Sequence, residues 1–164
     1  MTIILKNKGT LIFDDFIFRC CIGKTGLSKT KREGDKSTPI GTFSLGNLYY
    51  RKDRNSKPMT KLKCVSIKKE MGWCDDIKSK KYYNKLIKVS KKIKYENLYR
   101  KDHKYDFMIP INYNTKKTQL GKGSAIFLHL TENYKSTAGC VALRKKDFLI
   151  LLRLIDKKTK IKLS

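Results

Sequence analysis

Apolar residues in this chain occur mainly in short runs separated by polar segments, a pattern typical of strands rather than of long helices. The first two runs, residues 2–5 and 11–18, flank the turn residues 8–10 and predict a β-hairpin. Polar loops are expected at residues 23–37, 51–61 and 112–122. Further strands are expected at residues 42–45, 64–67, 86–89, 107–113, 126–128 and 141–143.

One segment near the C-terminus has helical periodicity instead. Phe148, Leu151, Leu152 and Ile155 fall at i, i+3, i+4 and i+7 and form an apolar stripe. Asp147 suits the positive N-terminal end of a helix dipole. The pattern predicts a C-terminal helix near residues 144–156, and a second, weaker helix is expected at residues 95–100. The expected fold is therefore mostly β and sandwich-like, with one or two helices.

The length of 164 residues favours a single domain spanning residues 1–164, large enough to bury a core without disulfide bonds. No apolar run approaches the length of a membrane span. Residues 1–18 are interrupted by charges at Lys6, Lys8, Asp14 and Asp15, so we interpret them as strands rather than as an export signal.

The formal net charge of +25 raises the possibility of nucleic-acid binding. Only seven of the 39 basic residues are arginine, however, and the lysines are dispersed along the chain. Because Arg rather than Lys provides bidentate readout of phosphate and guanine, a solvated lysine surface is the simpler interpretation. Such a surface would also attract anionic cell-envelope polymers weakly and in a salt-dependent way.

The five cysteines do not form an evident disulfide framework, because their number is odd and Cys20 and Cys21 are adjacent. Cys64 and Cys74 could pair if their strands approach each other, which the sequence leaves open. Cys20 and Cys21 are expected in the core.

Cys140 is the strongest candidate for chemistry, since it follows Gly139 and lies eleven positions after His129. An imidazole can accept the thiol proton, and the thiolate is the better nucleophile. Glycine permits a tight turn with free N–H groups that could hold an oxyanion. The alternatives are a small buried cysteine without a catalytic role and, less favoured, a zinc site that His103 and one of the other cysteines would complete.

The segment Ser136-Thr137-Ala138-Gly139-Cys140-Val141-Ala142-Leu143, together with His129, resembles the catalytic stretch of the YkuD-type L,D-transpeptidases. The similarity extends over residues 20–155 and includes the blocks 31–35, 38–43, 72–76, 83–84, 102–106 and 123–129. The chain departs from the family pattern at Ala138 and Ala142, where the better-known members have His and Arg. Arg144, two residues further along the strand, could replace that arginine because i and i+2 share a face.

The resemblance implies a cysteine acyltransferase that acts on peptidoglycan stem peptides through a Cys140 thioester and releases a terminal D-amino acid. His129 would be the base, and the N–H groups of Cys140 and of Gly139 or Ala138 would hold the oxyanion. This chemistry requires no metal or organic cofactor. Further residues are candidates for substrate binding: Ser136, Thr137, Trp73, Asp75, His103, Tyr105 and Arg144.

Two other functions remain open from the sequence. An L,D-carboxypeptidase or another cysteine hydrolase would share the thioester step, whereas a basic nucleic-acid or surface-binding module would not need Cys140. The expected partners are peptidoglycan stem peptides, with no specific nucleic acid and no transmembrane segment, for a protein acting as a monomer. The substrate favours the cell envelope or periplasm, although the absence of a visible signal peptide leaves the cytoplasm open.

Overall fold

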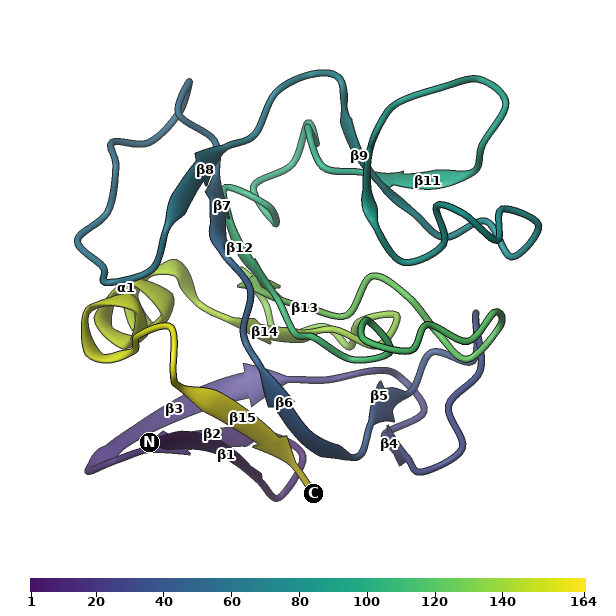
Figure 1. Ribbon diagram of the computed structural model, residues 1–164. Helices are drawn as coiled ribbons and strands as arrows, with labels where there is room; N and C mark the ends of the chain where they lie inside the picture. Colours follow the sequence, from purple (N-terminus) through teal and green to yellow (C-terminus); the bar gives the residue numbers. More distant parts are fainter.

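The computed structural model describes residues 1–164, and its main element is a ten-stranded sheet that curls around a hydrophobic core (Figure 1). Its strand order is β6-β15-β1-β2-β3-β14-β13-β12-β7-β8. The bounds in that order are Gly41–Ser44, Lys160–Leu163, Thr2–Lys6, Thr10–Phe13, Phe16–Cys21, Val141–Leu143, Phe127–Leu130, Phe107–Pro110, Leu48–Tyr50 and Cys64–Ser66. The mostly-β prediction is confirmed.

The first predicted hairpin is present, because β1 pairs antiparallel with β2. The run expected as one strand at residues 11–18 is instead two strands, β2 and β3, which pair around Asp14 and Asp15. Asp14 has a positive φ of 53°, a conformation that Asp tolerates in tight turns. The two aspartates therefore form a second turn inside an otherwise apolar run.

Residues 41–50 connect the two ends of the large sheet. Their first part, β6, pairs with β15, and their last part, β7, pairs with β12. Between them, Leu45 forms a bridge with Ile111, and the Gly46 N–H donates to the Pro110 carbonyl at 2.8 Å. The sheet is thereby drawn into a curled, barrel-like form, in which inward side chains meet across the core.

A second sheet contains three strands in the order β10-β9-β11, and a two-stranded pair, β4-β5, lies in the loop region near residue 30. The bounds are Leu86–Lys88, Met71–Cys74, Tyr95–Asn97, Leu27–Ser28 and Thr38–Pro39, respectively. The helix expected at residues 95–100 is therefore wrong. Tyr95 and Glu96 pair with Cys74 and Trp73 of β9, and these long-range hydrogen bonds outweigh the local helical preference.

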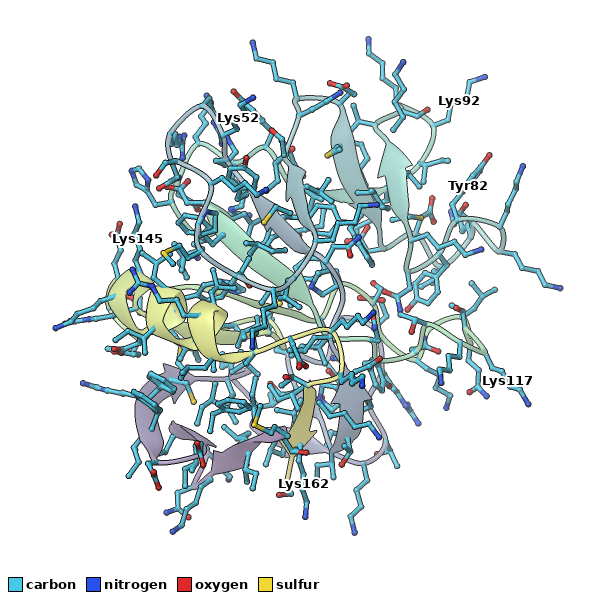
Figure 2. The ribbon with its side chains drawn as sticks, turned by 60° about the vertical axis from the view of Figure 1, so that its left-hand side comes forward. Lys52, Tyr82, Lys92, Lys117, Lys145 and Lys162 are labelled. Atoms are coloured by element: carbon cyan, nitrogen blue, oxygen red, sulfur yellow. The ribbon has the colours of Figure 1, made fainter.

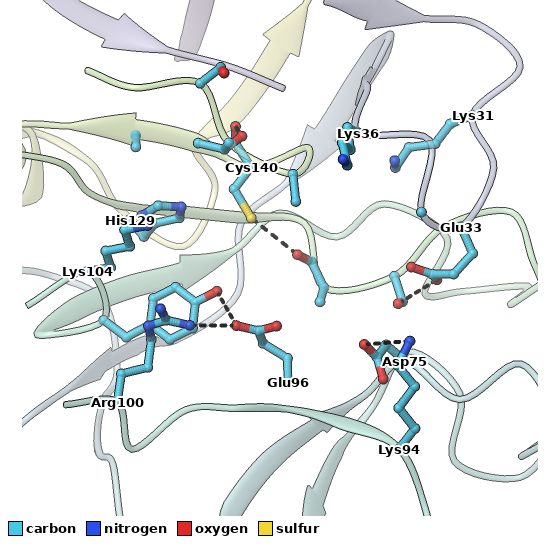
Figure 3. Close-up of a pocket in the computed structure, with 18 of the residues that line it drawn as sticks. Lys31, Glu33, Lys36, Asp75, Lys94, Glu96, Arg100, Lys104, His129 and Cys140 are labelled. Carbon is cyan, nitrogen blue, oxygen red and sulfur yellow. Dashed lines mark hydrogen bonds and ion pairs between the residues drawn. The ribbon is translucent and has the colours of Figure 1, made fainter. Parts of the chain in front are cut away.

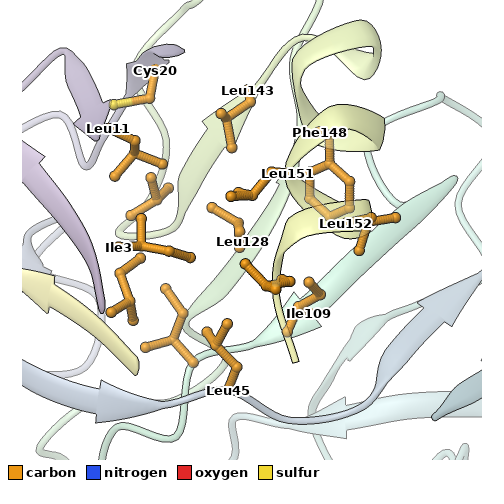
Figure 4. Packing of buried hydrophobic residues seen from close by; sticks show 14 of the residues in the cluster. Ile3, Leu11, Cys20, Leu45, Ile109, Leu128, Leu143, Phe148, Leu151 and Leu152 are labelled. Atoms are coloured by element: carbon orange, nitrogen blue, oxygen red, sulfur yellow. The ribbon is translucent and has the colours of Figure 1, made fainter. Parts of the chain in front are cut away.

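The single helix, α1 (Lys145–Leu154), confirms the C-terminal helix. It presents Phe148, Leu151 and Leu152 to a core cluster of 25 buried residues, which Figure 4 shows between the helix and the strands. Contacts with β13 place α1 behind that strand. The helix thus supports the sheet from the side opposite the candidate site described below.

All five cysteines are free, so Cys64 and Cys74 do not form a disulfide. Cys20 and Cys21 are buried, in agreement with their expected place in the core. Figure 2 shows the labelled lysines projecting into solvent from several parts of the fold rather than from one basic face. No helix in the structure has the length and hydrophobicity needed to cross a membrane.

Candidate active site

The candidate nucleophile and base come from two neighbouring parallel strands, β13 and β14. Leu128 pairs with Val141 and His129 with Ala142. Because successive side chains of a strand point to opposite faces, Cys140 and His129 lie on the same face of the sheet, while Leu128 points into the main core. The strand pairing thus brings together two residues that the sequence places eleven positions apart.

His129 is held in one tautomer. Its Nδ1 lies 2.8 Å from the Leu130 carbonyl oxygen, and because a carbonyl only accepts, Nδ1 carries the proton and donates it. The ring packs edge-on against Tyr105 at a centroid distance of 5.4 Å. Burial lowers the pKa of His129 to about 4, despite the hydrogen bond to Leu130. At neutral pH the imidazole is therefore uncharged, with a lone pair on Nε2 that can accept a proton.

The Cys140 thiol is also uncharged at neutral pH, because burial raises its pKa to about 12. Its hydrogen donates to the Ala125 carbonyl oxygen at 3.3 Å, and the Phe127 N–H donates to the sulfur at 3.3 Å. The hydrogen-bond partners of the thiol are thus backbone groups rather than the imidazole. For proton transfer to His129, the thiol hydrogen must leave the Ala125 carbonyl oxygen and form a hydrogen bond to Nε2 instead.

The turn before Cys140 is fixed by hydroxyl groups. Thr137 Oγ1 donates to the Cys140 carbonyl at 2.6 Å and accepts the Gly139 N–H at 3.1 Å. Thr38 Oγ1 donates to the Gly139 carbonyl at 2.8 Å. Gly139 has a φ of +141°, and a Cβ there would lie 2.7 Å from the Ser37 carbonyl oxygen. Only glycine fits this position, which confirms the predicted tight turn.

The other wall of the thiol site is held by Asn84. Its Oδ1 accepts hydrogen bonds from Trp73 Nε1 at 2.9 Å and from the Ala125 N–H at 3.1 Å. Its Nδ2 donates to the carbonyls of Tyr113 and Asn114 at 3.0 and 2.8 Å. The segment that offers the Ala125 carbonyl to the thiol is therefore tied to β9 and to the loop that follows β12.

Cys140 and His129 line a cleft of about 1220 Å³ between the curled sheet and the three-stranded sheet (Figure 3). Side chains of both charges line it. The bases are Lys31, Lys36, Lys78, Lys92, Lys94, Arg100, Lys104 and Lys135, and the acids are Glu33, Asp75, Asp76 and Glu96. Such a cleft can accommodate a peptide that carries both carboxylate and ammonium groups.

Several predicted site residues lie in this cleft. Besides Cys140 and His129, its lining includes Ser136, Thr137, Ala138, Asp75 and Tyr105. Asp75 forms an ion pair with Lys94 at 3.8 Å, and burial raises its pKa. Tyr105 donates its hydroxyl to Glu96 at 3.1 Å.

Three predicted substrate-binding residues lie elsewhere. Trp73 is buried and packs edge-on against Phe127, behind the cleft wall. His103 lies in a neighbouring cavity and pairs with Asp106 at 2.9 Å. The Arg144 guanidinium lies 5.2 Å from the centre of the Tyr134 ring, and Arg144, at the N-cap position of α1, does not line the cleft. It therefore does not supply a cation to the cleft in place of the arginine of the family pattern.

The sequence did not identify the cations that lie near the candidate nucleophile and base. Arg100 and Lys104 lie close enough to His129 to lower its pKa further, and Lys31 and Arg100 act in the same direction on the thiol pKa of Cys140. Arg100 belongs to the segment expected to be helical, which concealed its position next to β11. Lys31 belongs to the polar loop expected at residues 23–37, where its ammonium pairs with Asp35 at 2.8 Å.

Comparison with known families gives one match. The model of the family YkuD, described as the L,D-transpeptidase catalytic domain, matches residues 1–163. No curated protein and no solved structure matches the chain significantly.

Proposed function

Because the chain belongs to the YkuD family of L,D-transpeptidase catalytic domains, we propose that it is a cysteine acyltransferase acting on peptidoglycan stem peptides. One observation carries this proposal. An uncharged imidazole with a free Nε2 lies on the same sheet face as the only cysteine that lines the large cleft. Residues 1–164 form one catalytic domain in this proposal, and no metal or organic cofactor takes part.

The first step is attack by Cys140. His129 Nε2 takes the thiol proton, and Cys140 Sγ forms a bond to the carbonyl carbon between an L-centre and a terminal D-residue. The N–H groups of Cys140 and Ala138 stabilise the oxyanion, since the Gly139 N–H already donates to Thr137. As the C–N bond breaks, the imidazolium returns its proton to the amine of the leaving D-amino acid.

The second step decides the type of reaction. A thioester remains on Cys140, and attack by the amine of a neighbouring stem peptide gives a cross-link and restores the thiol. Attack by water instead makes the protein an L,D-carboxypeptidase, which remains the alternative. Arg100 and Lys104 line the cleft beside His129 and provide positive charge for the substrate carboxylate, whereas Arg144 does not line the cleft.

The substrate also implies where the protein acts. Peptidoglycan stem peptides are cross-linked in the cell envelope, so we propose that the protein acts there, and that it acts as a monomer. The dispersed lysine surface adds a weak attraction to anionic polymers but no specific nucleic-acid site.

The proposal is tested by incubating the purified protein with disaccharide-tetrapeptide fragments and analysing the products by mass spectrometry. We expect loss of the terminal D-residue, an acyl group on Cys140 and cross-linked dimers. Cys140→Ala and His129→Asn should abolish the reaction, whereas Cys64→Ala, which changes a half-buried cysteine outside the cleft, should not. Shortened fragments without dimers would favour the carboxypeptidase. Unchanged fragments with folded wild-type protein would refute both, and salt-sensitive binding to DNA or RNA that survives Cys140→Ala would favour the binding module.

A further inference from the structure

Lys31 is a buried charged residue next to the nucleophile turn. Only 4% of its surface is exposed, although lysine is rarely buried to this extent. Its side chain passes between two glycines that have positive φ. A Cβ on Gly123 would lie 2.8 Å from Lys31 Cε, and a Cβ on Gly139 would lie 3.4 Å from Lys31 Nζ. The two glycines therefore leave the space that the lysine fills.

The ammonium of Lys31 has one carboxylate partner, Asp35, at 2.8 Å. Asp35 also accepts the backbone N–H groups of Arg32 and Ser37 at 2.7 and 2.9 Å. The Ser37 carbonyl in turn contacts Gly139, as described above. Lys31 thus sits at one end of a short chain of contacts that runs through the loop at residues 31–37 to the residue before Cys140.

Burying an ammonium costs free energy, and one partly exposed carboxylate offsets it only in part. A lysine whose only task was to stabilise the loop could be replaced by an apolar residue of similar length. The position of the charge, at the wall of the cleft and beside Gly139, has a consequence for any anion that forms at Cys140 (Figure 3).

We propose that Lys31 is a positioning residue that holds the nucleophile turn in place and places a fixed positive charge where it favours the Cys140 thiolate. This rests on the proposed role of Cys140 as the nucleophile. Before it accepts the thiol proton, the buried His129 is uncharged and does not stabilise the Cys140 thiolate. The Lys31 ammonium is charged throughout and does stabilise it.

The other charged and titratable groups around Cys140 do not supply this effect in full. Glu96 of β11 disfavours the thiolate. Arg100 favours it but is paired with two carboxylates, Glu96 and Asp102, at 3.1 and 2.6 Å, whereas Lys31 is paired with Asp35 alone. The Tyr105 hydroxyl donates to Glu96, and burial raises its pKa, so that it is uncharged. Lys31 is the largest of the influences from positively charged side chains that lower the thiol pKa.

The test measures the thiol directly. Lys31→Gln removes the charge but retains an amide that can donate to Asp35, and Lys31→Met removes both. Each variant is alkylated with iodoacetamide at pH 8, and mass spectrometry of the digested protein follows Cys140 against the half-buried Cys64 as an internal reference. Loss of a nearby opposite charge raises a pKa by about 1 or more. The thiolate fraction of Cys140 then falls about tenfold. A thiolate of higher pKa is also more nucleophilic, which offsets part of the loss, so we expect alkylation of Cys140 to slow about threefold.

Lys29→Gln is the matched control, because it removes the same charge from the same polar segment, residues 23–37, at an exposed position that does not line the cleft. Its Cys140 rate should equal that of the wild type. A Cys140 rate in folded Lys31→Gln or Lys31→Met that also equals the wild type would overturn the proposal. If neither neutral variant folds, Lys31→Arg keeps the charge and must retain the wild-type rate. Alkylation needs no peptidoglycan, so this result and the turnover of stem peptides succeed or fail independently.

Discussion

Acidification should destabilise the protein through His129 before it affects most of the carboxylates. The native imidazole has a pKa of about 4 because it is buried, compared with an ordinary value of 6.5. Between these two values the unfolded chain binds a proton at His129 and the native protein does not. The free energy of unfolding therefore falls as the pH decreases through this window, and the contribution of an uncharged His129 is complete above pH 6.5.

The magnitude follows from the difference between the two pKa values. Each pH unit within the window costs about 1.4 kcal/mol, so that about 2 kcal/mol is lost between pH 6.5 and pH 5, and about 3 kcal/mol by pH 4. The carboxylates whose pKa is lowered in the native state, such as Asp102 and Asp106, contribute mainly below their ordinary value of 3.8. The interval from pH 6.5 to 5 therefore reports chiefly on the imidazole.

Urea denaturation of the wild type and of His129→Asn at pH 7, 6 and 5 measures this effect. Asparagine does not titrate, so the variant should lose about 2 kcal/mol less than the wild type over this interval, whatever its stability at pH 7. Parallel pH dependence in the two proteins would show that His129 is not held uncharged by burial. The proposed base, with its free Nε2 at neutral pH, would then need revision.

Further predictions concern the residues that build the site and the core. Gly139→Ala should destabilise the protein in urea and abolish stem-peptide turnover, because the added Cβ meets the Ser37 carbonyl oxygen. The control Gly34→Ala has a positive φ of 77° but open space around it, so it should cost only about 1 kcal/mol of stability and retain activity. Asn84→Ala should cost about 3 kcal/mol in urea denaturation, since buried partners such as the Trp73 indole N–H are left unpaired. A variant as stable as the wild type would show that water replaces the amide. Leu151→Ala should cost about 2–5 kcal/mol of stability, because Leu151 of α1 is fully buried. Leu120→Ala should cost less than about 1 kcal/mol, because Leu120 is 43% exposed. Similar losses in both variants would contradict the assigned core.

Local patterns were sufficient for much of the fold and for the choice of a candidate nucleophile and base. The apolar stripe of Phe148, Leu151 and Leu152 predicts α1 because helical periodicity is a property of neighbouring residues. Alternating or continuous apolar runs likewise predict β1, β12, β13 and β14. The Gly139-Cys140 turn and the preceding His129 indicate a nucleophile and a base because each belongs to a short segment with its own chemistry.

Elements that depend on distant partners were not predicted. Tyr95–Asn97 forms a strand only because Trp73 and its neighbours in β9 provide hydrogen bonds, and β15 pairs in parallel with β1 from the other end of the chain. The second turn at Asp14 and Asp15 interrupts an apolar run that a local reading takes as one strand. The closing of the sheet through residues 41–50 also depends on contacts between segments far apart in the sequence.

The same distinction applies to the site. Residue types identified Cys140 and His129, but they could not tell that Lys31 and Arg100 line the cleft while Arg144 packs over Tyr134. Charge and burial at a point in space are sums over everything that surrounds it, and most of the neighbours of the thiol come from other segments of the chain. Local sequence was therefore enough to indicate the family and to suggest a nucleophile and a base, whereas the electrostatic environment of the thiol followed only from the way the chain folds.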